Sequence, residues 1–119
     1  MLALFNRFLQ DPKPRMPGKP RALVIAPTRE LVIQIQKDAA ALGKYTGFRC
    51  LAVYGGLGMD EQRRELDFGV DLVAATPGRL IDFAMRGNLD LSQVEVLVID
   101  EADRMLDMGF IPDLSLIHI

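Results

Sequence analysis

Four short apolar runs alternate along the chain with segments of helical periodicity, and this alternation constrains the fold more than any other feature. The runs predict strands at 22–26, 48–54, 70–75 and 94–99, and the intervening segments predict helices at 29–42, 60–68 and 77–86. Run 22–26 reads ALVIA, a continuous apolar stretch typical of a strand buried on both faces. Elsewhere the sequence predicts a short helix at 2–9, a proline-containing loop at 11–21 and a helical stretch at 101–108.

Strands that alternate with helices favour an α/β fold, in which crossover helices pack on a parallel sheet. Ligands of such sheets gather at the carboxyl ends of the strands. In this chain the least ordinary residues fall at those ends: Pro27-Thr28-Arg29, Gly55-Gly56, Thr76-Pro77-Gly78-Arg79 and Asp100-Glu101. This coincidence predicts one functional site along that edge of the sheet.

The bulk composition narrows the class of protein. The 119 residues suffice for one small domain, and half of them are hydrophobic and a quarter charged, as in soluble globular domains. The formal net charge of −2 gives no support to nucleic-acid binding, so any such binding must come from local sites. The single cysteine, Cys50, excludes an internal disulfide and favours a reducing compartment, which predicts a cytoplasmic protein. No apolar run is long enough for a membrane span.

The fourth predicted strand delivers two carboxylates, Asp100 and Glu101, to the sheet edge, and Asp103 and Asp107 follow. Like charges at this density repel one another unless a cation offsets them. A magnesium ion carrying a phosphate would do so: in nucleoside triphosphatases an aspartate at a strand end helps to hold Mg²⁺ through its water shell, and a neighbouring acid polarises the attacking water. The structural alternative is that these acids simply favour the dipole of a following helix.

Two strand-to-helix turns carry an arginine. Threonine as a cap and proline at the first helical position explain Thr76 and Pro77, but they do not explain Gly78, which costs up to ~1 kcal/mol in a helix and permits close approach by another backbone. Helix-start amides beside Arg79 make a good phosphate site. The stretch from Pro27 to Glu30 has the same parts.

Each of these turns alone is most simply a strand-to-helix connection. Their shared edge favours a polyanion that touches both. Gly55-Gly56, by itself a turn signal, then becomes a place where a nucleic-acid backbone passes close to the protein.

Together these segments resemble the motifs of the DEAD-box ATP-dependent RNA helicases. Pro27 to Leu31 with Gln34 resembles the first RNA-contact motif, Gly55-Gly56 the double-glycine motif and Thr76 to Leu80 the TPGR motif. The run Asp100-Glu101-Ala102-Asp103 spells the motif that names the family, and 104–110 is its usual continuation. Order and spacing also fit, and the resemblance covers about 2–113. The overall sequence is similar to the bacterial branch of the family, near the RhlB and RhlE types.

The resemblance implies a RecA-like domain of the P-loop NTPase type, with ATP and Mg²⁺ as cofactors of the whole enzyme. Asp100 would orient the Mg²⁺ water shell, Glu101 would activate the water that attacks the γ-phosphate, and Asp103 would link the nucleotide site to RNA. The sugar-phosphate backbone of single-stranded or duplex RNA would be held by Pro27, Thr28, Arg29, Gly55, Gly56, Thr76, Pro77, Gly78 and Arg79. Backbone contacts need not read sequence, and a 2′-hydroxyl contact distinguishes RNA from DNA.

The resemblance stops short of the family pattern in two places. The phosphate-binding loop should end in G-K-[ST], but Pro20 follows Gly18-Lys19 and Tyr45 follows Gly43-Lys44. The second RecA-like domain, with its arginine finger, has no counterpart. We therefore expect 1–119 to be a partial first RecA-like domain, truncated at both ends, lacking the P-loop strand and closed by an atypical tail at 114–119 in which His118 is incidental. Such a chain should bind ATP poorly and be inactive alone.

Two further interpretations remain. The chain is alternatively a natural RNA-backbone-binding module without ATPase activity. In that case Arg29 and Arg79 bind RNA, and Asp100 and Glu101 have no catalytic role. It is otherwise an α/β domain unrelated to nucleotides, with a chance acidic strand end. The last interpretation requires four motifs to coincide in order.

Overall fold

A computed structural model describes residues 15–44, 47–56 and 58–101. Its four strands form one parallel sheet in the order β2-β3-β1-β4, with β1 at Ala22–Ile25, β2 at Cys50–Val53, β3 at Leu72–Ala75 and β4 at Val96–Ile99. This confirms the predicted α/β fold. The predicted helix at 2–9, Asp103, the helical stretch beyond residue 101 and the tail at 114–119 lie outside the described residues.

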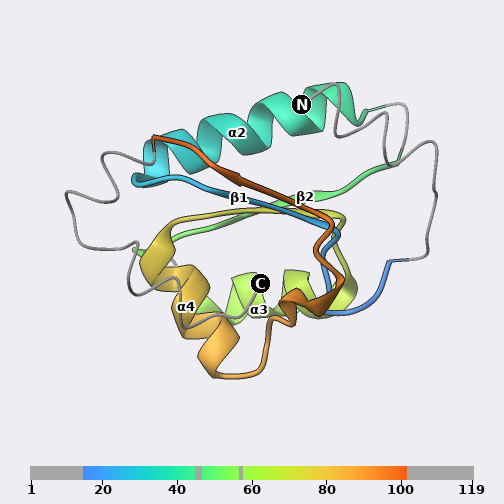
Figure 1. Cartoon of the computed structure of the whole chain (residues 1–119), viewed down its shortest axis with the longest axis vertical. Coiled ribbons are helices and arrows are strands. Elements are labelled where there is room, and N and C mark those ends of the chain that lie inside the picture. The colour runs from blue at the N-terminus through green and yellow to red at the C-terminus, as the bar shows by residue number, and fades with distance from the viewer. Residues whose placement is uncertain (1–14, 45–46, 57, 102–119) are drawn as a thin grey trace.

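Helices cover both faces of this sheet (Figure 1). Helix α2 (Arg29–Leu42) lies on one face, and α3 (Met59–Phe68) and α4 (Pro77–Met85) lie on the other. Because side chains alternate along a strand, β1 sends Leu23 and Ile25 towards the α3 and α4 side, where they share a core with Phe83. Its other residues, Ala22 and Val24, face α2. Both faces of β1 and β3 are therefore buried, as their unbroken apolar runs predict.

The predicted element boundaries agree closely with the structure where capping residues mark them. Helix α2 begins and ends as predicted, with Thr28 as its N-cap and Gly43 as its C-cap. Strands β2, β3 and β4 are each two to three residues shorter than the predicted runs, although flanking amides still pair across the sheet: those of Asp71 and Glu95 donate to the carbonyls of Arg49 and Arg21. A short 3₁₀ helix at Leu91–Gln93 was not predicted; Asp90 caps it through a 2.9 Å bond from the Ser92 amide.

Ion pairs concentrate at the amino ends of the strands. The guanidinium of Arg21 lies 2.6 Å from the carboxylate of Glu95, which joins the starts of β1 and β4. The buried carboxylate of Asp71 accepts a 2.9 Å bond from the Arg49 amide and lies 3.4 Å from Arg15. Hydrogen-bonded pairs with buried members of this kind help to hold the starts of neighbouring strands together.

Gly18 lies in the turn before β1 and packs against the loop that follows α4. Its amide donates to the Leu66 carbonyl at 2.9 Å, and its carbonyl accepts from the Asp90 amide at 2.7 Å. Its φ is +67°, and a Cβ built there would lie 2.7 Å from the backbone oxygen of Asn88. The turn therefore requires glycine for both its conformation and its close approach.

We expect Gly18→Ala to lower the free energy of unfolding by about 2–3 kcal/mol, because a left-handed alanine and a clash with backbone add together. Urea denaturation followed by circular dichroism measures the change. Gly87→Ala is the matched control: its φ is +80°, but a Cβ there meets nothing within 4 Å. It should cost only about 1 kcal/mol. Equal losses for the two variants would contradict the close-packing argument.

Strand β4 forms one edge of the described sheet and is only partly covered. Leu97, Val98 and Ile99 are 40%, 42% and 38% exposed, whereas the residues of β1 are all buried. Apolar side chains and the outer backbone groups of this edge are thus open to solvent. Within the described ranges, no helix has the length and apolar character to cross a membrane.

Candidate functional site

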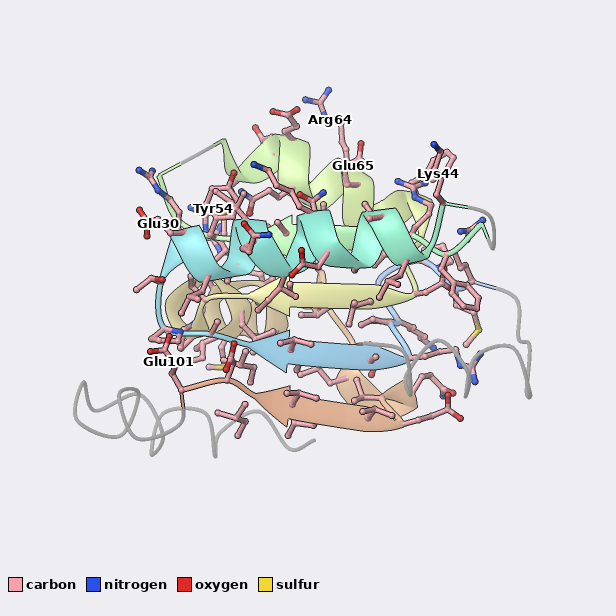
Figure 2. The ribbon with its side chains drawn as sticks, turned by 90° about the horizontal axis from the view of Figure 1, so that it is seen from above. Glu30, Lys44, Tyr54, Arg64, Glu65 and Glu101 are labelled. Atoms are coloured by element: carbon pink, nitrogen blue, oxygen red, sulfur yellow. The ribbon has the colours of Figure 1, made fainter. Side chains whose placement is uncertain are left out.

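The four strands end in a single row across the sheet. Ile25 pairs in register with Ala75 and with Ile99, and Ala75 pairs with Val53, so the last residue of every strand lies in this row. Neighbouring parallel strands are about 4.8 Å apart, which places all four ends within about 15 Å. The predicted site segments each follow this row directly. Figure 2 shows two of their residues, Glu30 and Glu101, at one end of the molecule with Tyr54, and Lys44 at the opposite end.

The segment after β1 turns directly into helix α2. Pro27 is buried, and Thr28 caps the helix by accepting a 3.3 Å bond from the Leu31 amide. Arg29 is exposed, with its Nε 3.7 Å from the Glu30 carboxylate. An ion pair at this length and exposure restrains an arginine weakly. The guanidinium therefore stands at the helix start, where helix amides and the dipole favour an anion.

The segment after β2 lies against this arginine. Gly55 and Gly56 are both exposed, and Gly56 has a φ of +89°, which favours glycine. A Cβ built on Gly56 would lie 3.2 Å from Nη1 of Arg29. The structure thus brings together two predicted site segments, since Arg29 and Gly56 are 27 positions apart in the numbering.

The segment after β3 opens helix α4. Thr76 is the N-cap residue and Pro77 is at the first helical turn, as predicted, although the Thr76 side chain makes no capping hydrogen bond. The Thr76 amide instead donates to the Val53 carbonyl at 3.0 Å and extends the ladder to β2. Gly78 is exposed, and a Cβ there would meet nothing within 4 Å. Space over the first turn of α4 is therefore open to a ligand backbone.

Arg79 is half-buried and held from two sides. Its Nη1 donates to Oε1 of Gln62 at 3.3 Å, and its guanidinium carbon lies 5.9 Å from the centre of the Phe83 ring. Nε2 of Gln62 in turn donates to the Tyr54 carbonyl at 3.0 Å. Sequence reasoning missed Gln62, because a polar residue in the polar helix α3 gives no periodic signal. The one signal available was its place on the helix face that also carries the buried Leu66.

The acidic segment follows β4 at the exposed edge of the sheet. The Asp100 amide donates to the Ile25 carbonyl at 2.8 Å, so this residue continues the β1–β4 ladder and its side chain is half-buried. Glu101 is exposed and adopts a φ of +52°, a left-handed conformation that costs a non-glycine residue about 1–2 kcal/mol. The structure therefore delivers both carboxylates to the sheet edge, as predicted.

The donor set at this edge suits magnesium held through water. Within 15–44, 47–56 and 58–101, no three acidic, histidine or cysteine side chains group closely enough to hold a metal directly. Mg²⁺ commonly keeps several waters and binds one or two carboxylates together with substrate phosphates. Asp100 and Glu101 fit that mode of binding, and a fully coordinating protein cage is not needed.

Neither glycine–lysine pair lies near these acids. Lys19 precedes β1, at the amino end of the sheet, and its Nζ lies 3.7 Å from the Asp90 carboxylate. Lys44 follows α2 at the end of the molecule opposite Glu101 (Figure 2). The sequence around the two lysines does not fit a phosphate-binding loop, and their positions are far from the acids. Both observations exclude these lysines as phosphate ligands at the acidic edge.

Cys50 is a half-buried thiol that packs against the core. It starts β2 and packs with residues of the α2 face of the sheet. Burial disfavours the thiolate and raises the pKa of Cys50 from 9.0 to about 12. A raised pKa disfavours the thiolate, which is the nucleophilic form, at neutral pH.

Curated proteins of similar sequence are RNA helicases. The ATP-dependent RNA helicase RhlB of Pseudomonas aeruginosa is 56% identical over 115 residues, which cover 94% of this chain and 29% of that protein. RhlB of Shewanella piezotolerans is 48% identical over 116 residues, covering 96% of this chain and 26% of the relative. The chain thus spans less than a third of the length of these relatives.

Solved structures of similar fold include a DEAD-box splicing factor and a hypothetical RNA helicase. The yeast DEAD-box splicing factor Prp28 matches with a TM-score of 0.86 and 38% identity, over 96% of this chain and 27% of that one. A hypothetical ATP-dependent RNA helicase from Sulfolobus tokodaii matches with a TM-score of 0.77 and 42% identity, over 82% of this chain and 29% of that one. These neighbours confirm a RecA-like sheet.

The match to a protein family extends over the whole chain. The family model described as DEAD/DEAH box helicase matches residues 1–119. This range includes all four strand-end segments and the two acids at the edge of the sheet. The chain belongs to the DEAD/DEAH box helicase family.

Proposed function

We propose that this chain forms part of the first RecA-like domain of an ATP-dependent RNA helicase and that its strand-end edge binds the RNA backbone. One observation carries the RNA proposal: Gly56 lies against the guanidinium of Arg29, and Arg79 is tied through Gln62 to the end of β2. Three segments from separate parts of the chain therefore form one continuous surface over β2, β3 and β1.

The chemistry of this surface suits a sugar-phosphate backbone. Arg29 and Arg79 supply planar donors for phosphate, and the first turns of α2 and α4 supply amides with the positive end of a helix dipole. The exposed glycines Gly55, Gly56 and Gly78 allow another backbone to approach closely. Thr28 and Thr76, with Pro27 and Pro77, set the direction of the two turns. None of these groups discriminates one base from another, so binding should be independent of sequence.

The acidic edge has a separate role in the proposal. Asp100 would help to hold the water shell of Mg²⁺ on ATP, and Glu101 would act as base for the attacking water, with Asp103 linking this site to the RNA surface. ATP bound with Mg²⁺ supplies the leaving group; the carboxylates position water and accept its proton. The longer protein would contribute the phosphate loop and a second RecA-like domain.

A second candidate function is RNA binding without ATPase activity. The observation that favours it is the separation of the two parts: the RNA-side segments are all present, whereas neither lysine that follows a glycine lies near the acids. Under this alternative, the 119-residue chain binds RNA, and substitutions of Asp100 and Glu101 leave its affinity for RNA unchanged.

We expect Arg79→Ala to weaken binding of a fluorescein-labelled single-stranded oligouridine about tenfold or more, because a charge-assisted hydrogen bond to phosphate is worth about 1.5–3 kcal/mol. Fluorescence anisotropy titrations at several salt concentrations measure the affinity. The slope of log affinity against log salt should fall by about 0.7, as expected for one lost phosphate contact on a single strand.

Arg86→Ala is the matched control for this experiment. Arg86 follows the same helix at its other end, is exposed and pairs with Asp82 at 3.0 Å. Its removal changes the net charge as much as Arg79→Ala does, but at a distance from the strand-end row. Equal weakening by the two variants would mean that RNA affinity depends on net charge and not on the position of Arg79. Unchanged affinity of Arg79→Ala would contradict the proposal.

A further inference from the structure

We propose that Gln62 is a positioning residue for RNA binding: it fixes the Arg79 guanidinium relative to the Gly55-Gly56 turn. The inference rests on the proposed RNA function and adds a residue that lies outside all four strand-end segments. Gln62 belongs to helix α3, which otherwise contributes nothing to the site.

The side chain of Gln62 is used at both ends. Oε1 accepts from Arg79 Nη1 at 3.3 Å, and Nε2 donates to the Tyr54 carbonyl at 3.0 Å. The residue is only 6% exposed, so these bonds form away from bulk water. Buried amides need their partners, because an unsatisfied buried polar group costs about 1–3 kcal/mol. Helix α3 therefore holds its amide in one orientation, with the acceptor towards α4 and the donor towards β2.

This orientation decides where Arg79 points. An arginine side chain has several rotatable bonds, and binding an anion requires that they be fixed. The Phe83 ring, fully buried beneath α4, supports the guanidinium from one side, and Gln62 engages one of its five N–H groups. The direction of the other N–H donors of Arg79 is thereby fixed before a phosphate binds. Preorganisation of this kind raises affinity without adding a contact to the ligand.

The other end of Gln62 connects this arginine to the glycine turn. Tyr54 is the residue between β2 and Gly55, so its carbonyl stands at the start of the turn. A single amide thus sets the spacing between two RNA-contact segments that adjacent strands deliver. A polynucleotide has a fixed spacing between phosphates, and a displacement of one segment relative to the other would lose one of the two contacts.

The test is a double-mutant cycle on RNA affinity with the whole 119-residue chain and labelled oligouridine. Methionine has the length of glutamine and similar helix propensity, so Gln62→Met keeps the packing of α3 and removes both hydrogen bonds. We expect Gln62→Met to weaken binding about three- to tenfold, and most of this loss to disappear in the Arg79→Ala background. A structural role alone would give the same loss in both backgrounds.

Gln36→Met is the matched control. Gln36 lies on α2 and lines, with Gln62, Tyr54 and Glu65, a hollow of about 170 Å³ on the outer side of β2. The Gln36→Met substitution should change RNA affinity less than about twofold. If Gln62→Met is unfolded by circular dichroism, Gln62→Asn replaces it in the cycle, because its neutral amide keeps the polarity of the position but is one methylene too short to reach both Arg79 and the Tyr54 carbonyl. A different effect with and without Arg79 then supports the inference, and an equal effect overturns it.

The possible outcomes separate the inference from the function on which it rests. If Arg79→Ala weakens binding and Gln62→Met behaves as Gln36→Met does, Gln62 has no positioning role and the RNA surface stands. If Arg79→Ala leaves affinity unchanged, the RNA function fails and the inference fails with it. Loss in Gln62→Met that depends on Arg79 supports both.

Discussion

The purified 119-residue chain is expected to hydrolyse ATP at least about 10³ times more slowly than a complete RNA helicase, with or without RNA. The reason is electrostatic. Phosphoryl transfer depends on groups that cradle the phosphates and on an arginine that reaches the transition state, and the arginine alone is worth about 10³–10⁵ in rate. This chain provides the carboxylates Asp100 and Glu101 but has no G-K-[ST] sequence.

A coupled phosphate-release assay with saturating RNA measures this rate, and Glu101→Gln identifies its source. Turnover that persists in Glu101→Gln comes from a contaminating enzyme. RNA-stimulated turnover that Glu101→Gln abolishes would contradict the expectation and would show that the chain builds a working site by other means. In the longer helicase, the same substitution should lower turnover by about 10²–10⁴, the usual contribution of a general base, while RNA binding remains.

The second large expected effect concerns the state of association. Strand β4 presents Leu97, Val98 and Ile99, all more than a third exposed, and among the described residues no strand pairs with its outer edge. Such an edge is a template for pairing with another copy. We expect the chain to associate reversibly at first and to precipitate at higher concentration. Sedimentation velocity at increasing protein concentrations follows this association.

Val98→Lys should shift the onset of association to about tenfold higher concentration or more, because a lysine on an edge strand disfavours pairing: two copies would bring like charges together on facing strands and lose the apolar contact of Val98. Met85→Lys is the matched control: Met85 is 73% exposed but belongs to α4, away from the sheet edge. A monomer that melts sharply and reversibly at all concentrations would contradict the edge-pairing argument, as would equal protection by both substitutions.

The sequence predicted the fold well because its local signals agreed with one another. The run ALVIA at β1 and the cap residues Thr28 and Gly43 determined a strand and a helix without reference to the rest of the chain. Crossover geometry then required a parallel sheet, and a parallel sheet brings the strand-end segments to one edge. The strand order, with β4 beside β1, has no local signal, since it depends on pairing between distant runs.

The candidate site was predicted in part. The position of Arg29, Arg79 and the glycines at one edge of the sheet agrees with the sequence, which singled them out because they are unusual at strand-to-helix turns. The hydrogen bonds of Gln62 were not predicted, because they depend on a carbonyl and a guanidinium brought to it by two other elements. The proximity of Gly56 to Arg29 was also hidden, since neither the backbone course of a left-handed glycine turn nor the direction of the Arg29 side chain can be read from sequence spacing.

The two ends of the sheet carry different kinds of constraint. Ion pairs and close-packed turns, such as Arg21 with Glu95 and Gly18 against Asn88, hold the amino ends, whereas exposed glycines and arginines occupy the carboxyl ends. A pooled library of substitutions should therefore separate into two groups: changes at the amino ends lower the amount of folded protein, and changes at the carboxyl ends lower RNA capture at normal abundance. On the proposed RNA function, we expect that the carboxyl edge can be re-engineered towards a different polyanion while the framework beneath it stays intact.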